Sequence, residues 1–369
     1  MSLVPETTVL AIASHVVYGY VGNTMAAFVM QSLGCDVAAL NTVHFSNHTG
    51  YRQFKGSRAS AQDIDDLYQG LALNRLTDFD VMLSGYAPSA AAVEAVGAIG
   101  LDLQRQAASK PGSFFWVLDP VMGDQGRLYV NPDVVPAYKN IIRHADLILP
   151  NQFEAEVLSG ITITSIPTLA DAITAIHRTY SLPHVIITSV QLSRLSHPPS
   201  STPAPNDLTV IGSTTRSDGS ARLFRVDVPA LDCFFSGTGD MFAALMVARL
   251  REAVFDVPGL KDAPSWVSTD DVAPTDLPLA KAAVKVLASM HSVLEKTLEA
   301  RAAELSVQPD EPPGLDDAER QKRDHLRRTK AAEVRLVRNV QFLQHPVVEF
   351  KVQGVEQGRS AAGASIDST

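Results

Sequence analysis

The sequence predicts an α/β fold with a mostly parallel central β-sheet that helices cover on both faces. Short apolar runs rich in β-branched residues recur along about the first 250 residues, and segments with helical spacing lie between most of them. Polar residues follow the ends of five of these runs. Strands that alternate with helices form βαβ units, whose parallel strands are buried on both faces.

The expected strands follow one another along the first half of the chain. In order they are VLAIAS (9–14), VAAL (37–40), VMLSG (81–85), FFWVLD (114–119), DLILP (146–150) and VIITS (185–189). The expected helices between them span residues 22–33, 60–73, 89–107, 152–159 and 168–179.

Polar residues at the strand ends predict a ligand site. They are Ser14, Ser84 to Tyr86, Asp119, Asn151 and the pair Thr188 and Ser189. A single polar residue at a strand end carries little meaning, because polar residues begin there in most proteins. Five such positions on one edge favour a site, since ligands of open parallel sheets bind outside the carboxyl ends of the strands.

The chain is expected to hold one folded domain, formed by residues 1–304 and 332–352. Residues 191–207, rich in Pro and Ser, and residues 256–280 are interpreted as inserted loops. Residues 305–331 pass from acidic to basic and are expected to be a disordered surface insert with a short charged helix. Residues 353–369 are expected to be a flexible tail.

Composition excludes several classes of partner. The 369 residues are 46% hydrophobic and carry a net charge of -9, so neither a nucleic acid nor an anionic membrane surface is an expected partner.

The cysteines and the N-terminal segment give further expectations. The two cysteines, Cys35 and Cys233, are far apart in the sequence, so we expect them to be small buried residues that neither form a disulfide nor bind zinc. With no basic, apolar leader and no long apolar run, we expect a cytoplasmic location that can extend to the nucleus.

Residues 234–244, FFSGTGDMFAA, place two glycines and a threonine before an aspartate that opens an apolar helix. The first N–H groups of a helix and its dipole attract anions, and glycines let a phosphate approach the backbone closely. The alternative is an ordinary loop in which Asp240 is only an acid at a helix start. As part of a phosphate site, Asp240 would instead accept the proton of an attacking hydroxyl.

No familiar nucleotide motif accompanies this turn. Neither the GxxxxGKS/T motif nor the HRD and DFG motifs of protein kinases occurs, and no GxGxxG follows the first strand. A phosphoryl-transfer enzyme with this sequence must therefore use another cradle for the phosphates.

The motifs in their order resemble a known family. GTGD before an apolar helix, DPVMGD at 119–124 and PNQFEAEVLSG at 150–160 resemble the ribokinase-type vitamin kinases, and SHVVYGYVGN at 14–23 and FSNHTGY at 45–51 are similar to pyridoxal kinases. The resemblance runs in order through residues 9–190 and 226–300. It implies a ribokinase-like fold and ATP-dependent phosphorylation of the 5'-hydroxymethyl group of pyridoxal, pyridoxine and pyridoxamine in vitamin B6 salvage.

The resemblance also implies roles for individual residues around the vitamin. Asp240 would be the general base, and the N–H groups of Gly237, Thr238 and Gly239 would hold the transferring phosphoryl group. Ser14, Thr49 and Tyr86 would make polar contacts with the vitamin, and Val21, Val43 and Phe45 would form the apolar walls. His48 and Tyr51 are interpreted as packing residues and receive no role.

The resemblance implies a second set of residues, which would bind ATP and its divalent cation. Asp119, Asp124 and Glu154, with Asn151, would hold Mg²⁺ or another divalent cation against the phosphates of ATP. Thr188, Ser189 and Thr238 would contact ATP, Val286 and Leu287 would lie near the adenine, and Asp124 and Tyr129 would belong to a lid, GDQGRLYV at 123–130. The alternatives are that Asp119 is a turn former, Glu154 a first-turn helix acid, and the Val286–Leu287 pair plain core.

Two further properties come from the resemblance alone, a homodimer and a K⁺ ion as an additional cofactor. Some animal members carry Thr near the cation site, where this chain has Leu149. Other functions stay open at this point: a kinase for hydroxymethylpyrimidine or another vitamin alcohol, a sugar kinase, or a non-catalytic carrier or regulator that binds pyridoxal 5'-phosphate.

Overall fold

The protein is described by a computed structural model, which covers residues 4–190, 207–307 and 314–355. Its strands are β1 (Thr8–Tyr18), β2 (Asp36–Asn47), β3 (Gly56–Arg58), β4 (Val81–Ser84), β5 (Phe115–Leu118), β6 (Gly123–Asp124), β7 (Arg127–Leu128), β8 (Leu147–Ile148), β9 (His184–Val190), β10 (Asp207–Thr215), β11 (Ala221–Pro229) and β12 (Val352–Gly354). Its α-helices are α1 (Gly22–Ser32), α2 (Ala61–Leu73), α3 (Ala90–Ala107), α4 (Val134–Ile141), α5 (Gln152–Ser159), α6 (Ile166–Tyr180), α8 (Thr238–Phe255), α9 (Pro278–Ser306), α10 (Asp317–Ala331) and α11 (Val340–Gln344).

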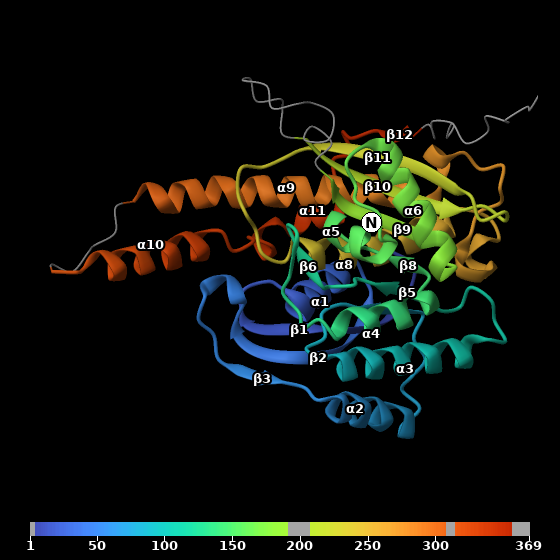
Figure 1. Cartoon of the computed structure of the whole chain (residues 1–369), viewed down its shortest axis with the longest axis horizontal. Helices are drawn as coiled ribbons and strands as arrows, with labels where there is room; N and C mark the ends of the chain where they lie inside the picture. The colour runs from blue at the N-terminus through green and yellow to red at the C-terminus, as the bar shows by residue number, and fades with distance from the viewer. Residues whose placement is uncertain (1–3, 191–206, 308–313, 356–369) are drawn as a thin grey trace, which may run out of the picture.

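In the described residues, ten strands form one twisted sheet in the order β12-β11-β10-β9-β8-β5-β4-β1-β2-β3 (Figure 1). The central six strands, from β9 to β2, are parallel. The strands outside them, β3 on one side and β10, β11 and β12 on the other, are antiparallel to their neighbours. The predicted mostly parallel α/β architecture is therefore confirmed. Strand β1 lies between β2 and β4, so the strand order changes direction at β1. Ligands of such sheets bind at the carboxyl ends of the strands beside this point.

Helices cover both faces because the central strands are apolar on both sides. In β1, Val9 and Ala11 pack into one core, while Leu10 and Ile12 pack into the other. The first core lies under α1, α8, α9 and α11, and the second lies under α2 to α6. Fully buried apolar strands of this kind predict parallel pairing, which the sheet confirms.

Several elements lie outside the sequence-based expectation. Helix α4, the short β6–β7 hairpin and the long β10–β11 hairpin were not expected from the strand and helix pattern. Residues 256–280 are a tightly packed insert: Trp266 is buried and its ring stacks on Phe115 with centroids 4.0 Å apart. The buried guanidinium of Arg222 donates hydrogen bonds to the carbonyls of Ser268 and Thr269 and so anchors the insert to β11.

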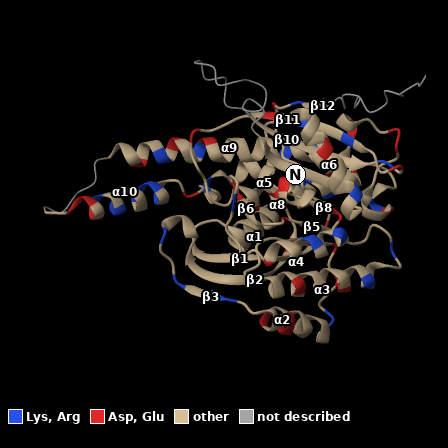
Figure 2. Ribbon diagram, viewed as in Figure 1, with Lys and Arg blue, Asp and Glu red and all other residues tan. Residues whose placement is uncertain are grey.

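Residues 317–331 form helix α10, the charged helix expected within the insert, and residues 308–313 of the insert lie outside the described residues. The N-terminus of α10 is capped by Asp316, whose carboxylate accepts the Glu319 N–H at 2.8 Å. Acidic and basic side chains alternate along the helix, with ion pairs such as Arg328–Asp324 at 2.6 Å (Figure 2). Arg327 donates to the Leu305 carbonyl at 2.9 Å, so α10 lies along the end of α9. Tertiary anchoring and capping thus give structure to a segment whose composition alone indicates disorder.

The remaining expectations on the chain's organisation fall partly outside the described residues. Residues 191–206, most of the first expected loop, and residues 356–369, most of the expected tail, are not described. Residues 353 and 354, assigned to the tail, belong to strand β12, which pairs with β11. Among the described helices, none has the combination of length and apolar character that a membrane crossing requires.

Candidate active site

The SGTG turn leads into α8 and leaves the first N–H groups of that helix open. Gly237 is the N-cap residue and has a φ of 82°, in the left-handed region that favours glycine. A Cβ atom at this position would lie 2.2 Å from the Tyr20 carbonyl oxygen. Within the described chain no side chain caps this helix end. The N–H groups of Thr238 and Gly239 are therefore free to bind an anion.

Asp240 lies in the first turn of α8 and is half-buried. Burial raises the pKa of its carboxyl group to about 6, and a hydrogen bond from the Gly22 N–H offsets part of this effect. Gly22 opens α1, and a Cβ atom there would lie 2.0 Å from the Ser14 carbonyl oxygen. The glycine turns at Gly22 and Gly237 thus bring the C-terminal end of β1 and the N-terminal end of α8 close to the Asp240 carboxylate. A carboxylate with a pKa near 6 can act as a general base at neutral pH.

A second carboxylate, Asp119, lies directly after β5 and faces the cradle. A Cβ atom built on Gly239 would lie 3.7 Å from Asp119 Oδ2. The Asp119 N–H donates to the Ser84 carbonyl at 2.8 Å, which fixes the backbone there. Burial, then the charges of Glu154 and Asp240, raise the pKa of Asp119 well above its usual value. Asp119, Glu154 and Asp240 therefore form one acidic cluster, in which the charges of Glu154 and Asp240 both disfavour ionisation of Asp119.

Glu154 is buried and anchors the neighbouring loop. Its carboxylate accepts backbone N–H groups of Met122 at 2.8 Å and of Asn151 at 3.0 Å. Asn151 caps α5 by accepting the Glu154 N–H, and its side chain donates to the Gly123 carbonyl at 2.7 Å. Burial raises the pKa of Glu154 to about 7. The first-turn helix role considered for Glu154 is thus present in the structure, beside its membership of the acidic cluster.

The expected lid corresponds to the β6–β7 hairpin, whose base Glu154 and Asn151 hold. Asp124 is exposed, and its carboxylate accepts the N–H of its neighbour Gln125 at 2.8 Å. Tyr129 is 61% exposed. Asp124 thus lies on the hairpin, where its charge helps to raise the pKa of Glu154, and Tyr129 lies directly after it. In the three described ranges, no group of three or more His, Cys, Asp and Glu side chains is arranged to hold a metal ion.

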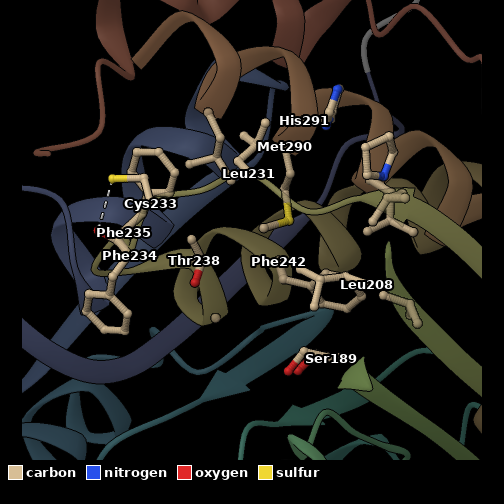
Figure 3. Close-up of a pocket in the computed structure, with 17 residues that line it drawn as sticks. Ser189, Leu208, Leu231, Cys233, Phe234, Phe235, Thr238, Phe242, Met290 and His291 are labelled. Carbon is tan, nitrogen blue, oxygen red and sulfur yellow. Dashed lines mark hydrogen bonds between the residues drawn. The ribbon is translucent and has the colours of Figure 1, made fainter. Parts of the chain in front are cut away.

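A cavity of about 260 Å³ adjoins the cradle on the side of α9. Thr188 and Ser189 at the end of β9 line it, together with Thr238, Gly239 and Leu287. In Figure 3 Thr238 and Phe242 lie on α8, with Met290 above them and Ser189 below them. The other lining residues are Leu208, Val210, Val228, Pro229, Leu231, Cys233, Phe234, Phe235, His291 and Leu294.

The two apolar residues expected near the adenine lie in different places. Val286 has no exposed surface and belongs to the core, whereas Leu287 lines the cavity. One face of α9 lines the cavity with residues that follow one another at helical spacing, Leu287, Met290, His291 and Leu294. In the sequence, this spacing is the signal that groups them on one face of the helix. Cys233, expected to be buried, is half-buried and also lines the cavity.

A separate apolar cluster adjoins the turn before Asp240, where a Cβ atom on Gly237 would lie 3.2 Å from Val21 Cγ1. Val21, Val43 and Phe45 pack there with Val16, and Tyr86 lies against them. These are the residues expected to wall the vitamin, and the structure brings them together. Ser14 pairs with Val43 across the β1–β2 register at a β-bulge, which places it beside this cluster. Thr49 is exposed in the short turn η1 (Thr49–Tyr51) that follows β2.

The site therefore has two compartments that meet at the cradle. The cavity beside α9 presents hydroxyl groups and apolar walls, the cluster beside β1 and β2 presents apolar side chains and Ser14, and Asp240 with its open N–H groups lies between them. Such an arrangement can hold two substrates end to end, with a base and an anion-binding turn at their junction.

Comparisons with known proteins agree with this geometry. The model of the phosphomethylpyrimidine kinase family matches residues 102–270. That range includes the acidic cluster and the SGTG turn but not the segments 14–23 and 45–51. The human pyridoxal kinase is 34% identical over 310 residues, which cover 81% of this chain and 88% of that protein. The sheep pyridoxal kinase (Ovis aries) is 36% identical over 307 residues, with the same two coverages of 81% and 88%.

Solved structures give the same result. A pyridoxal kinase of Leishmania donovani in complex with ADP and pyridoxamine superposes with a TM-score of 0.73 at 29% identity, covering 95% of this chain and all of that one. The same enzyme with ADP and pyridoxine gives a TM-score of 0.73 at 28% identity, covering 95% and 99%. The resemblance first noticed in the motifs, and the ribokinase-like fold that it implies, are confirmed. This chain belongs to the pyridoxal kinase family.

Proposed function

We propose that this protein is an ATP-dependent pyridoxal kinase that phosphorylates the 5'-hydroxymethyl group of pyridoxal, pyridoxine and pyridoxamine. The observation that carries the proposal is the position of Asp240 at the open N-terminus of α8, between the cavity beside α9 and the apolar cluster beside β1 and β2. ATP occupies the cavity, the vitamin occupies the cluster, and the γ-phosphate lies over the SGTG turn.

In this arrangement the reaction needs three contributions from the chain. Asp240 accepts the proton of the vitamin hydroxyl as its oxygen attacks the γ-phosphorus, and the bond to the β-phosphate oxygen breaks to release ADP. The N–H groups of Thr238 and Gly239 stabilise the negative charge of the transferring phosphoryl group. A pKa of about 6 suits the base, because Asp240 is then mostly ionised at neutral pH yet still basic enough to take a proton.

A divalent cation, for which Mg²⁺ is the expected ion, would bind at Asp119 with waters and phosphate oxygens as further ligands, because the described residues offer no group of three or more acidic, His or Cys side chains arranged around a metal. The effects that raise the pKa of Asp119 are burial and two negative charges. Such a cluster of oxygen ligands suits Mg²⁺, which also keeps waters and takes phosphate oxygens as ligands. Asp119 would hold the ion, with Glu154 acting through water because its oxygens already accept backbone N–H groups; the ion would neutralise phosphate charge. A role for K⁺, a homodimer and a cytoplasmic location remain predictions.

The proposal is tested by Mg²⁺- and ATP-dependent formation of pyridoxal 5'-phosphate, followed by its absorbance. We expect the wild type to be active and Asp240→Asn and Asp240→Ala to lose roughly two or more orders of magnitude in kcat, the usual contribution of a general base. Asp256→Asn, at the exposed far end of the same helix, is the matched control and is expected to keep full activity.

Hydroxymethylpyrimidine in the same assay separates the related vitamin kinase from the proposal. A wild type that phosphorylates hydroxymethylpyrimidine but none of the three B6 vitamers would contradict it. A wild type that binds pyridoxal 5'-phosphate tightly and forms none would favour the carrier function instead.

A further inference from the structure

One acidic side chain from the C-terminal part of the chain reaches the vitamin side of the site. Glu333 follows α10, and its Oε1 atom lies 3.1 Å from His48 Nε2 and 2.9 Å from the Tyr51 hydroxyl oxygen. The side chains of His48 and Glu333 are each only 10% exposed. Both partners of Glu333 lie in the FSNHTGY segment, at the turn η1, which lies under α10 in Figure 1.

The hydrogen bonds around His48 define which of its nitrogens carries the proton. Nδ1 accepts the Gly50 N–H at 3.2 Å, so it has a lone pair rather than a hydrogen. Nε2 therefore bears the hydrogen and donates it to Glu333. Nδ1 also lies 3.4 Å from the Ser236 hydroxyl oxygen, in the turn that holds the cradle. The ring thus connects Glu333 to the residue before Gly237.

Tyr51 and Gly19 complete the contacts of Glu333. Burial and the Glu333 hydrogen bond raise the pKa of Tyr51, so its hydroxyl stays protonated and donates. At Gly19, where φ is 99°, a Cβ atom would lie 2.6 Å from Glu333 Oε2. Gly19 belongs to the β1–α1 connection that also contains Val21 and Gly22. The α10 helix adds one more contact, from His325 Nε2 to the Gly50 carbonyl at 3.0 Å.

We propose that Glu333 is a positioning residue for the vitamin site. Its carboxylate holds together the turn η1, the β1–α1 connection and, through His48, the turn before the cradle. These are the segments that carry Thr49, Val21 and Gly237, so Glu333 sets the spacing between the vitamin and the base without touching either substrate. This inference rests on the proposed pyridoxal kinase activity.

The test compares kinetic constants for each substrate. Glu333→Ala is expected to raise the KM for pyridoxal about tenfold, equivalent to about 1.4 kcal/mol, while the KM for ATP stays within about twofold. Glu333→Gln keeps an oxygen acceptor for His48 and Tyr51 and should restore most of the affinity. Glu319→Gln, on the exposed side of α10, is the matched control and should leave every constant unchanged.

A double-mutant cycle separates positioning from a general loss of stability. Tyr51→Phe removes one of the two hydrogen bonds, so it should raise the KM for pyridoxal in the wild type but add nothing in Glu333→Ala. An unchanged KM for pyridoxal in Glu333→Ala would overturn the inference, as would equal increases for pyridoxal and ATP. If the wild type forms no product, the proposed function fails on its own. Pyridoxal binding by calorimetry then decides the role of Glu333: weaker binding to Glu333→Ala supports it, and equal binding overturns it.

Discussion

Replacing the Asp240 carboxylate by an amide should stabilise the fold even though it abolishes catalysis. The pKa of Asp240 rises from its usual 3.8 to about 6 in the folded protein, mainly because of burial. The folded protein therefore binds the proton more tightly than the unfolded chain does, and the ionised carboxylate opposes folding. This cost is absent below about pH 4, grows as the pH rises through about 6, and is complete above it.

The size of the effect follows from the shift. A difference of about two pKa units corresponds to about 3 kcal/mol in the free energy of unfolding. Asp240 is half-buried, so water screens part of its charge, and we expect Asp240→Asn to gain about 1–3 kcal/mol at pH 8. With an unfolding entropy of about 2.1 cal/mol/K per residue, this gain raises Tm by about 1–4 °C.

The assay is thermal unfolding without ligands at pH 8 and pH 4, with urea titration as a second measure of stability. Asp240→Asn should melt higher than the wild type at pH 8 and at the same temperature at pH 4. Asp256→Asn, the exposed acid at the other end of α8, controls for a change in net charge. A Tm for Asp240→Asn that is equal to or below the wild-type value at pH 8 would refute the argument that burial strains this carboxylate.

Three further predictions concern the same site. The kcat/KM for pyridoxal should fall below about pH 6 as Asp240 takes up a proton, and a pH–rate profile that stays flat down to pH 5 would contradict this assignment. Gly237→Ala should reduce kcat at least tenfold, because φ of 82° and the close backbone leave no room for a Cβ atom, while Gly219→Ala, also at positive φ but with open space in the β10–β11 turn, should not. Leu287→Ala should raise the KM for ATP, whereas Val286→Ala should leave this KM unchanged and lower stability by about 1–3 kcal/mol, as measured by kinetics and urea unfolding.

The parallel core of the fold was predictable, because its strands are apolar on both faces and stand out as short runs. The β10–β11 hairpin was not, because β10 follows directly on a Pro/Ser-rich stretch and ends in polar residues such as Ser213 and Thr214, which are buried beside His177 and His184 through hydrogen bonds. A short charged helix was expected in residues 305–331, but the placement of α10 was not, because it depends on the contact of Arg327 with the end of α9. Tertiary contacts of this kind leave no local signal in the sequence.

The candidate site was predictable where one short motif carries both a backbone turn and a functional group. The turn at Gly237 and the acid Asp240 are adjacent, so a single stretch indicates both. The lid base was only partly predictable, since Glu154 is at once a helix-capping acid and a member of the acidic cluster. Glu333 could not be found in this way, because its partner His48 is 285 residues away and each of the two is unremarkable in its own segment.

The separation between His48 and Glu333 has a consequence for the newly made protein. His48 is synthesised early and Glu333 late. At roughly 5–20 residues per second, the 285 residues that separate them take about 15–60 s to synthesise. Until Glu333 is synthesised, the nascent chain contains β1, β2 and the apolar cluster beside them but lacks the hydrogen bonds from His48 and Tyr51 to Glu333. The protein therefore reaches its full affinity for the vitamin only near the end of translation, and an interrupted chain that stops after α9 would have a vitamin site without its positioning contact.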